Sequence, residues 1–271
     1  MSPERVFDMP HYRALDAAKL KLLREIVAAW KQQLGLQTAW DAGCGVGHYS
    51  ELLVELGFQT RAFDGREDNV AEAGRRVPSL EIGLADVENP AITEWGSADL
   101  VFCLGLLYHL ENPFRAICNL SKMTSKIMVV ESMCTWDELP VLYLREEGPT
   151  EDQGLRHIAF YPSESCLVKM LYRAGFARVY RFTRLPDNVD FIHSVEQKSR
   201  RTMLVASRSE FSSPYLEPVF ERPADYDPWK TRWVPVLQAA RRFTHFVTKP
   251  WPEKVATMRR LCGLGRPLKS V

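Results

Sequence analysis

The stretch from Thr38 to His48 constrains the fold of this chain more than any other part of the sequence. An apolar lead-in ends at Asp41, and glycines follow at every second position as Gly43, Gly45 and Gly47. Glycine has no Cβ, so its backbone tolerates a positive φ angle and lets other groups come close. The pattern predicts a strand, a tight turn able to hold a ligand, and a helix packed on that strand.

The spacing of these glycines argues against a dinucleotide site. A dinucleotide fingerprint, G-x-G-x-x-G, would place its third glycine at position 48, where this chain has His48. The G-x-G-x-G loop behind Asp41 resembles the nucleotide-binding loop of the class I S-adenosylmethionine-dependent methyltransferases. The resemblance implies that Asp41, Gly43, Gly45 and Gly47 bind S-adenosyl-L-methionine, whose zwitterionic methionine end needs backbone donors and a carboxylate. A chance strand–turn–helix or another nucleotide fold is the alternative for the loop taken alone.

A second acid follows one helix later. The stretch 60–65 contains a short expected strand, which ends at Asp64 before Gly65. Consecutive strands of a right-handed strand–helix–strand unit are adjacent, so we expect Asp64 beside Gly45, where its carboxylate accepts from both ribose hydroxyls. The alternative is that Asp64 only forms the turn before Gly65.

A third expected strand, residues 80–88, carries Asp86. In the resembling family an acid at this place accepts from the adenine amine, and the next backbone amide meets a ring nitrogen. The resemblance therefore implies that Asp86 and Val87 bind the adenine. Asp86 alternatively opens the loop toward Asn89.

The expected fourth strand, residues 98–105, runs into a loop at the carboxyl edge of the sheet. The phrase from Gly105 to Pro113 resembles that of a subset of class I methyltransferases, which includes the tRNA wobble-uridine carboxymethyltransferases. The resemblance covers about residues 41–207 and implies that Leu104 and Tyr108 line the donor pocket, but it does not transfer the RNA substrate.

His109 is the candidate catalytic residue in this loop. A neutral imidazole can take a proton from a hydroxyl, amine or carboxylic acid as the methyl group leaves sulfur. Two alternatives stay open. In the first, His109 is a helix-capping or packing residue. In the second, alignment of the nucleophile with the methyl group is enough for the transfer.

The remaining pattern predicts an α/β fold, a doubly wound, seven-stranded, mostly parallel Rossmann-like sheet. Residues 11–34 form an amphipathic helix ahead of it, with Lys19 and Lys21 expected on the outer face. The aromatic and basic segment 7–13 either folds over the cofactor or caps the surface. Residues 176–182 and 201–207 are expected to form an antiparallel pair at one edge.

Two further segments complete the predicted organisation. A connection of about thirty residues, 133–161, is interpreted as a substrate lid within a domain of residues 1–210. Residues 211–271 form a basic helical appendage containing tryptophan, with ten Lys or Arg against one acid in residues 229–271. That tail carries +9 and the remainder −8. Three interpretations of the tail are open: it packs on the acidic core, contacts an anionic membrane surface, or contacts RNA.

Composition and length bear on the size of the core, on membrane segments and on metal sites. A chain of 271 residues with 46% apolar content can bury one sizeable core and carry an appendage. No run of eighteen apolar residues and no signal-peptide start occur in the sequence, so we expect a cytoplasmic protein without a transmembrane segment. The six cysteines are scattered without metal-like spacing, so no metal site is expected.

The sequence therefore predicts an S-adenosylmethionine-dependent methyltransferase acting on an unidentified acceptor. A small molecule or a glycan or lipid-linked sugar is favoured, and an RNA-modifying methyl- or carboxymethyltransferase is the alternative. A non-catalytic donor-binding or scaffold protein and a nicotinamide oxidoreductase are the rivals from other classes.

Overall fold

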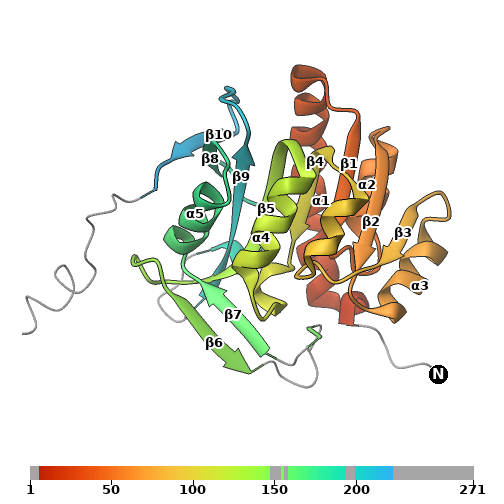
Figure 1. Ribbon diagram of the computed structural model, residues 1–271, viewed down its shortest axis with the longest axis horizontal. Helices are drawn as coiled ribbons and strands as arrows, with labels where there is room; N and C mark the ends of the chain where they lie inside the picture. Colours follow the sequence, from red (N-terminus) through yellow and green to blue (C-terminus); the bar gives the residue numbers. More distant parts are fainter. Residues whose placement is uncertain (1–5, 147–153, 156–157, 193–198, 222–271) are drawn as a thin grey trace, which may run out of the picture. The chain divides into compact units, whose positions relative to one another are not determined.

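An eight-stranded sheet forms the centre of the protein in a computed structural model, which describes residues 6–146, 154–155, 158–192 and 199–221 (Figure 1). All of these residues belong to one compact unit, residues 1–221. In spatial order from one edge the strands are β3 (Glu81–Leu84), β2 (Gln59–Asp64), β1 (Thr38–Ala42), β4 (Ala98–Leu104), β5 (Thr124–Thr135), β9 (Ser199–Ser207), β8 (Arg178–Phe182) and β10 (Leu216–Val219).

The connections around this sheet are those of a doubly wound fold. Strands β3, β2, β1, β4 and β5 are parallel, whereas β9 is antiparallel to both β5 and β8. The chain leaves β1 toward β2 and later returns to the other side of β1 as β4, so the order reverses between β1 and β4. The carboxyl edge at such a reversal is where ligands bind in open α/β sheets.

The predicted fold class is confirmed, with a correction to the strand count. All seven expected strands form, and an eighth, β10, adds antiparallel to β8. Strand β10 lies beyond residue 210, where the methyltransferase-like domain was predicted to end. That domain boundary stays a prediction. The expected strand 80–88 is shorter, ending at Leu84, so Asp86 and Val87 follow it in a loop.

Helices cover both faces of the sheet (Figure 1). Along β4, Leu100, Phe102 and Leu104 pack with α1 (Pro10–Leu34) and α2 (His48–Glu55). On the other face Val101 and Cys103 pack with α4 (Pro113–Met123) and α5 (Glu164–Arg173), as a strand buried on both faces requires. The helices are α1 (Pro10–Leu34), α2 (His48–Glu55), α3 (Glu67–Arg76), α4 (Pro113–Met123) and α5 (Glu164–Arg173), with short 3-10 turns η1 (Val6–Asp8), η2 (Pro90–Trp95), η3 (Leu107–His109) and η4 (Val189–Phe191).

The first helix corrects one prediction from the sequence. Lys19 was expected on the outer face of α1, but it is only 4% exposed. Its position follows from the helical period, because residues 15, 19, 22 and 26 share one stripe and the other three are buried leucine or isoleucine. A cation on this stripe needs anionic partners inside the protein, and Glu131 and Asp16 supply them.

The predicted lid segment contains an antiparallel hairpin of its own. Strands β6 (Leu142–Glu146) and β7 (Ile158–Pro162) form a separate two-stranded sheet after β5, which itself continues to Thr135 (Figure 1). Ser163 then caps α5 by accepting a hydrogen bond from the Cys166 backbone amide. Within the part of the chain that the structure describes, no helix is both long and apolar enough to cross a bilayer.

Candidate functional site

The turn between β1 and α2 has the backbone expected from its glycines. Gly43, Gly45 and Gly47 have φ angles of 67°, 53° and 90°. A Cβ at each of these positions would meet a side chain of the protein: Leu106 at 2.6 Å from position 43, Phe7 at 2.9 Å from position 45, and Ala73 at 3.2 Å from position 47. The glycines therefore also make room for neighbouring side chains, which the sequence argument did not anticipate.

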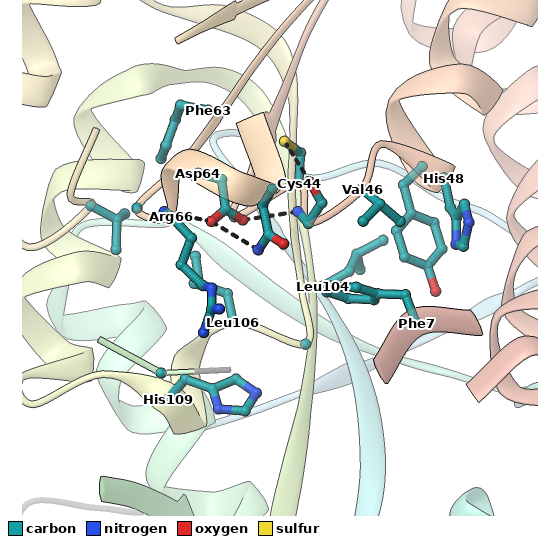
Figure 2. A pocket seen from close by; sticks show the side chains of 18 of the residues that line it. Phe7, Cys44, Val46, His48, Phe63, Asp64, Arg66, Leu104, Leu106 and His109 are labelled. Atoms are coloured by element: carbon teal, nitrogen blue, oxygen red, sulfur yellow. Dashed lines mark hydrogen bonds between the residues drawn. The ribbon is translucent and has the colours of Figure 1, made fainter. Parts of the chain in front are cut away.

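Asp64 holds this turn and borders the pocket. Its Oδ2 accepts from the Gly45 amide at 2.9 Å, and its Oδ1 accepts from the Arg66 amide at 2.9 Å and from Asn69 at 3.2 Å. Burial raises the pKa of Asp64, although these hydrogen bonds oppose the shift. Asp64 thus forms the turn, as the alternative interpretation holds, and stands beside Gly45, as the ribose interpretation requires (Figure 2).

Asp86 and Val87 border the same pocket from the loop after β3. Asp86 Oδ1 accepts from the Glu88 amide at 2.8 Å, which is the local turn that the alternative predicts. Val87 is 4% exposed and packs in the core beneath. The pair supplies an acid and an apolar side chain close to Asp64.

Asp41 lies beneath the glycine turn. It is 1% exposed, and the Ser50 hydroxyl donates to its Oδ2 at 2.6 Å. Burial raises the pKa of Asp41 to about 7, with the hydrogen bond from Ser50 opposing this. Neither Asp41 nor Gly47 borders the pocket, so in this structure both belong to the support of the turn, and their role in donor binding stays a prediction.

Leu104, Tyr108 and His109 line the pocket from the carboxyl end of β4 and from η3. Tyr108 is buried, and its ring lies 4.1 Å from that of His109, measured between centroids. Gly105, with φ of 75°, permits the sharp turn out of the strand. Burial raises the pKa of Tyr108, so its phenol stays protonated at neutral pH.

A buried ionic cluster beside Tyr108 was not predicted. Glu131 is 0% exposed and accepts from Lys19 at 3.3 Å and from Arg201 at 2.8 Å. Arg201 also donates to the Tyr108 hydroxyl at 3.3 Å. Lys19 and Arg201 border the pocket. Burial would raise the pKa of Glu131, but the charges of Lys19 and Arg201 lower it, so the carboxyl is ionised.

Sequence signals for this cluster were weak. Glu131 is the last but one residue of the expected strand 126–132, and Arg201 begins the apolar run of β9, but 70 positions separate them. An ionisable residue within an apolar strand is the one signal that points to a buried partner.

The predicted lid reaches this site at two places. Leu155 borders the pocket and lies 2.9 Å from the position of a Cβ on Gly65. Tyr161 of β7 packs edge-on against Tyr108, with ring centroids 6.0 Å apart. The hairpin is therefore next to the pocket, and its role in acceptor binding stays a prediction.

Figure 2 shows how these side chains surround the pocket. Asp64 projects from the end of β2, Phe7 and His48 lie on one side, and His109 lies on the other. The lining of the pocket also includes Phe63, Leu104 and Leu106. The pocket combines apolar walls, acids at two strand ends and backbone amides of a glycine turn, a combination that suits an adenosine-containing ligand.

Comparison with known proteins identifies one part of the chain. Residues 40–126 match the family described as "Methyltransferase domain". These residues form a class I methyltransferase domain. Within this methyltransferase domain lie all the residues predicted to bind the donor, together with His109.

Similar sequences come from two groups of methyltransferases. A tRNA U34 carboxymethyltransferase of Desulfotalea psychrophila is 29% identical over 187 residues, covering 64% of this chain and 54% of that relative. A ubiquinone biosynthesis O-methyltransferase of Xanthomonas axonopodis pv. citri is 34% identical over 114 residues, covering 39% and 46%. The chain thus spans about half the length of the curated relatives that it matches.

Solved structures share the fold of the methyltransferase domain. The N-terminal domain of EvdMO1, solved with SAH bound, has a TM-score of 0.57 at 17% identity, covering 73% of this chain and 84% of that chain. The sugar N-methyltransferase KedS8 of Streptoalloteichus has a TM-score of 0.52 at 16% identity, covering 78% and 95%.

Proposed function

We propose that the protein binds S-adenosyl-L-methionine in this pocket and transfers its methyl group to an acceptor. The observation that carries the proposal is the convergence of the glycine turn, Asp64 and Asp86 on one pocket at the carboxyl edge, beside the reversal between β1 and β4. The relatives are named methyltransferases, and EvdMO1 was solved with SAH.

Each predicted residue has a role in this proposal. Gly43 and Gly45 present the turn to the methionine end, with Asp41 and Gly47 fixing its shape. Asp64 accepts from the ribose through the lone pairs that its protein donors leave, because each carboxylate oxygen accepts more than one hydrogen bond. Asp86 and Val87 face the adenine, and Leu104 and Tyr108 complete the wall.

The donor supplies an electrophilic methyl group on a sulfonium. The protein contributes alignment of the acceptor with that group and exclusion of water from an apolar pocket. In this proposal His109, which lines the pocket, takes the proton of the acceptor.

Carboxymethyl transfer is a second candidate. Several relatives are named carboxymethyltransferases, and a carboxymethyl donor would carry a carboxylate on the transferred carbon. Lys19 and Arg201 border the pocket and would attract that carboxylate, although Glu131 and Asp16 already balance them. For the acceptor we favour a small molecule or a glycan or lipid-linked sugar, with RNA as the alternative.

The deciding experiment combines binding with turnover. Isothermal titration with S-adenosyl-L-methionine, a carboxylated analogue and NADH identifies the donor. Incubation with methyl-labelled donor and fractionated cell extract then identifies the fraction that becomes labelled. Binding without labelling of any fraction favours the scaffold interpretation, and NADH binding favours the oxidoreductase.

The basic tail lies outside the described residues. We propose that residues 229–271 contact an anionic membrane surface or RNA, or pack on the acidic remainder, in a cytoplasmic protein. Co-sedimentation with anionic vesicles or with RNA at rising salt, for the full chain and for a chain ending at Pro228, separates these possibilities.

A further inference from the structure

The 3-10 turn η1 places an aromatic ring directly on the glycine turn. Phe7 Cζ lies 2.9 Å from the position that a Cβ on Gly45 would occupy, so the ring packs on bare backbone. Phe7 also borders the pocket, on the side of Val46 and His48 (Figure 2). The segment ahead of α1 is therefore part of the pocket wall.

Asp8 fastens this wall to α3. Arg76 Nη2 donates to Asp8 Oδ2 at 3.1 Å, and Arg76 Nη1 lies 2.9 Å from His48 Nε2. A guanidinium can only donate, so His48 Nε2 accepts and the imidazole proton lies on Nδ1. That nitrogen donates to Asp16 Oδ2 at 3.3 Å. The contacts thus join η1, α3, α2 and α1 around the glycine turn.

Two carboxyl groups, Asp16 and Asp8, take part in this chain of contacts. Burial would raise the pKa of Asp16, but the hydrogen bond from His48 and the charge of Lys19 lower it to about 2. The side chains of Arg76 and Asp8 are 22% and 25% exposed, so their ion pair is partly shielded from water. Arg13, which is largely exposed, approaches Asp8 at 3.5 Å.

A neighbouring arginine offers a matched comparison. Glu72 accepts from both Arg75 and Arg76. Arg76 continues to Asp8 and His48, whereas the Arg75 side chain is 71% exposed. Removing Arg75 therefore removes one ion pair of Glu72 and leaves the contacts of η1 in place.

We propose that Phe7 is a donor-binding residue and that Arg76 is a positioning residue, which holds Phe7 in place through Asp8 and His48. This inference rests on the donor binding proposed above. The ring lies over the turn assigned to the methionine end, and it keeps water away from the hydrogen bonds made there. Such bonds are stronger in a water-poor surrounding.

Isothermal titration of the full chain with S-adenosyl-L-methionine tests the inference. Phe7→Ala is expected to weaken binding about 10-fold, because most of a phenylalanine's apolar contact is lost. Arg76→Ala is expected to weaken it several-fold, Arg76→Lys less, and Arg75→Ala not at all. The double variant of Phe7→Ala and Arg76→Ala should bind no more weakly than Phe7→Ala alone, since a residue that acts through another adds nothing once that residue is gone.

The results separate the two proposals. If the wild type does not bind the donor, the proposed function fails and this inference fails with it. If the wild type binds and Phe7→Ala binds equally or more tightly, the inference alone is overturned. Additive losses in the double variant would show that Arg76 does not act through Phe7, as would an equal loss in Arg75→Ala.

Discussion

Replacing Glu131 with glutamine tests whether the buried ionic cluster holds the site together. Glu131→Gln keeps the size of the side chain but removes the anion that lies between Lys19 and Arg201, which are 5% and 6% exposed in their side chains. Breaking a buried ion pair by removing one partner costs about 3–5 kcal/mol, because the remaining charge is left uncompensated.

The contacts that survive place the expected loss at the lower end of that range. Lys19 keeps Asp16 at 3.3 Å, and Arg201 keeps Asp190 at 3.4 Å. We therefore expect Glu131→Gln to lower the free energy of unfolding by about 3 kcal/mol. For a unit of this size that corresponds to a fall in Tm of about 6–12 °C.

Urea unfolding followed by circular dichroism measures this loss. Glu55→Gln is the matched control, since Glu55 pairs with Arg24 at 2.5 Å on the surface with both side chains about half exposed. That variant should lose less than about 1 kcal/mol. A Glu131→Gln protein within about 1 kcal/mol of wild type would refute the reasoning, because the cluster would then contribute no more than a surface pair.

Three further predictions concern single carboxyl and imidazole groups. Asp64→Ala should weaken donor binding by about 1.5–3 kcal/mol in titrations of a variant shown to be folded, and unchanged affinity would remove Asp64 from the site. His109→Asn should lower turnover of labelled donor about 100-fold or more with donor affinity nearly unchanged; if turnover persists, alignment alone drives the transfer. Because burial raises the pKa of Asp41 from 3.8 to about 7, the folded state holds a proton that the unfolded state releases between these values. Stability should therefore fall by up to about 4 kcal/mol as pH rises from 4 to 7, and Asp41→Asn should remove that decline in urea unfolding at several pH values; an unchanged slope would contradict it.

Local patterns were sufficient to predict seven strands of the central sheet and the glycine turn. The turn at Gly43 and Gly45 follows from the absence of a Cβ, and the two acids follow from their places at or just after the ends of expected parallel strands. These signals lie within a few residues of each other, so the sequence displays them directly. The adjacency of β1 and β2 also followed, because consecutive strands of a right-handed strand–helix–strand unit lie side by side.

Features that depend on distant residues were missed. Lys19 was expected outside because a cation on a helix is usually solvated, and its partner Glu131 is 112 positions away. Strand β10 contains Pro218, which is a poor strand former, and it is accommodated at the edge of the sheet beside β8. Phe7 belongs to the segment 7–13, for which the sequence left open whether it folds over the cofactor or caps the surface, because its place on Gly45 depends on the folded path of α1.

The position of β9 makes one wall of the pocket depend on strand pairing between segments far apart in the chain. This strand lies between β5 and β8, although it follows both in the chain, and it carries Arg201 to the pocket wall. The wall beside Tyr108 therefore stays incomplete until β9 has paired with β5, and β8 joins the sheet through β9. Since contacts between distant segments form slowly, donor binding should mature with this late step, after the parallel half of the sheet has paired.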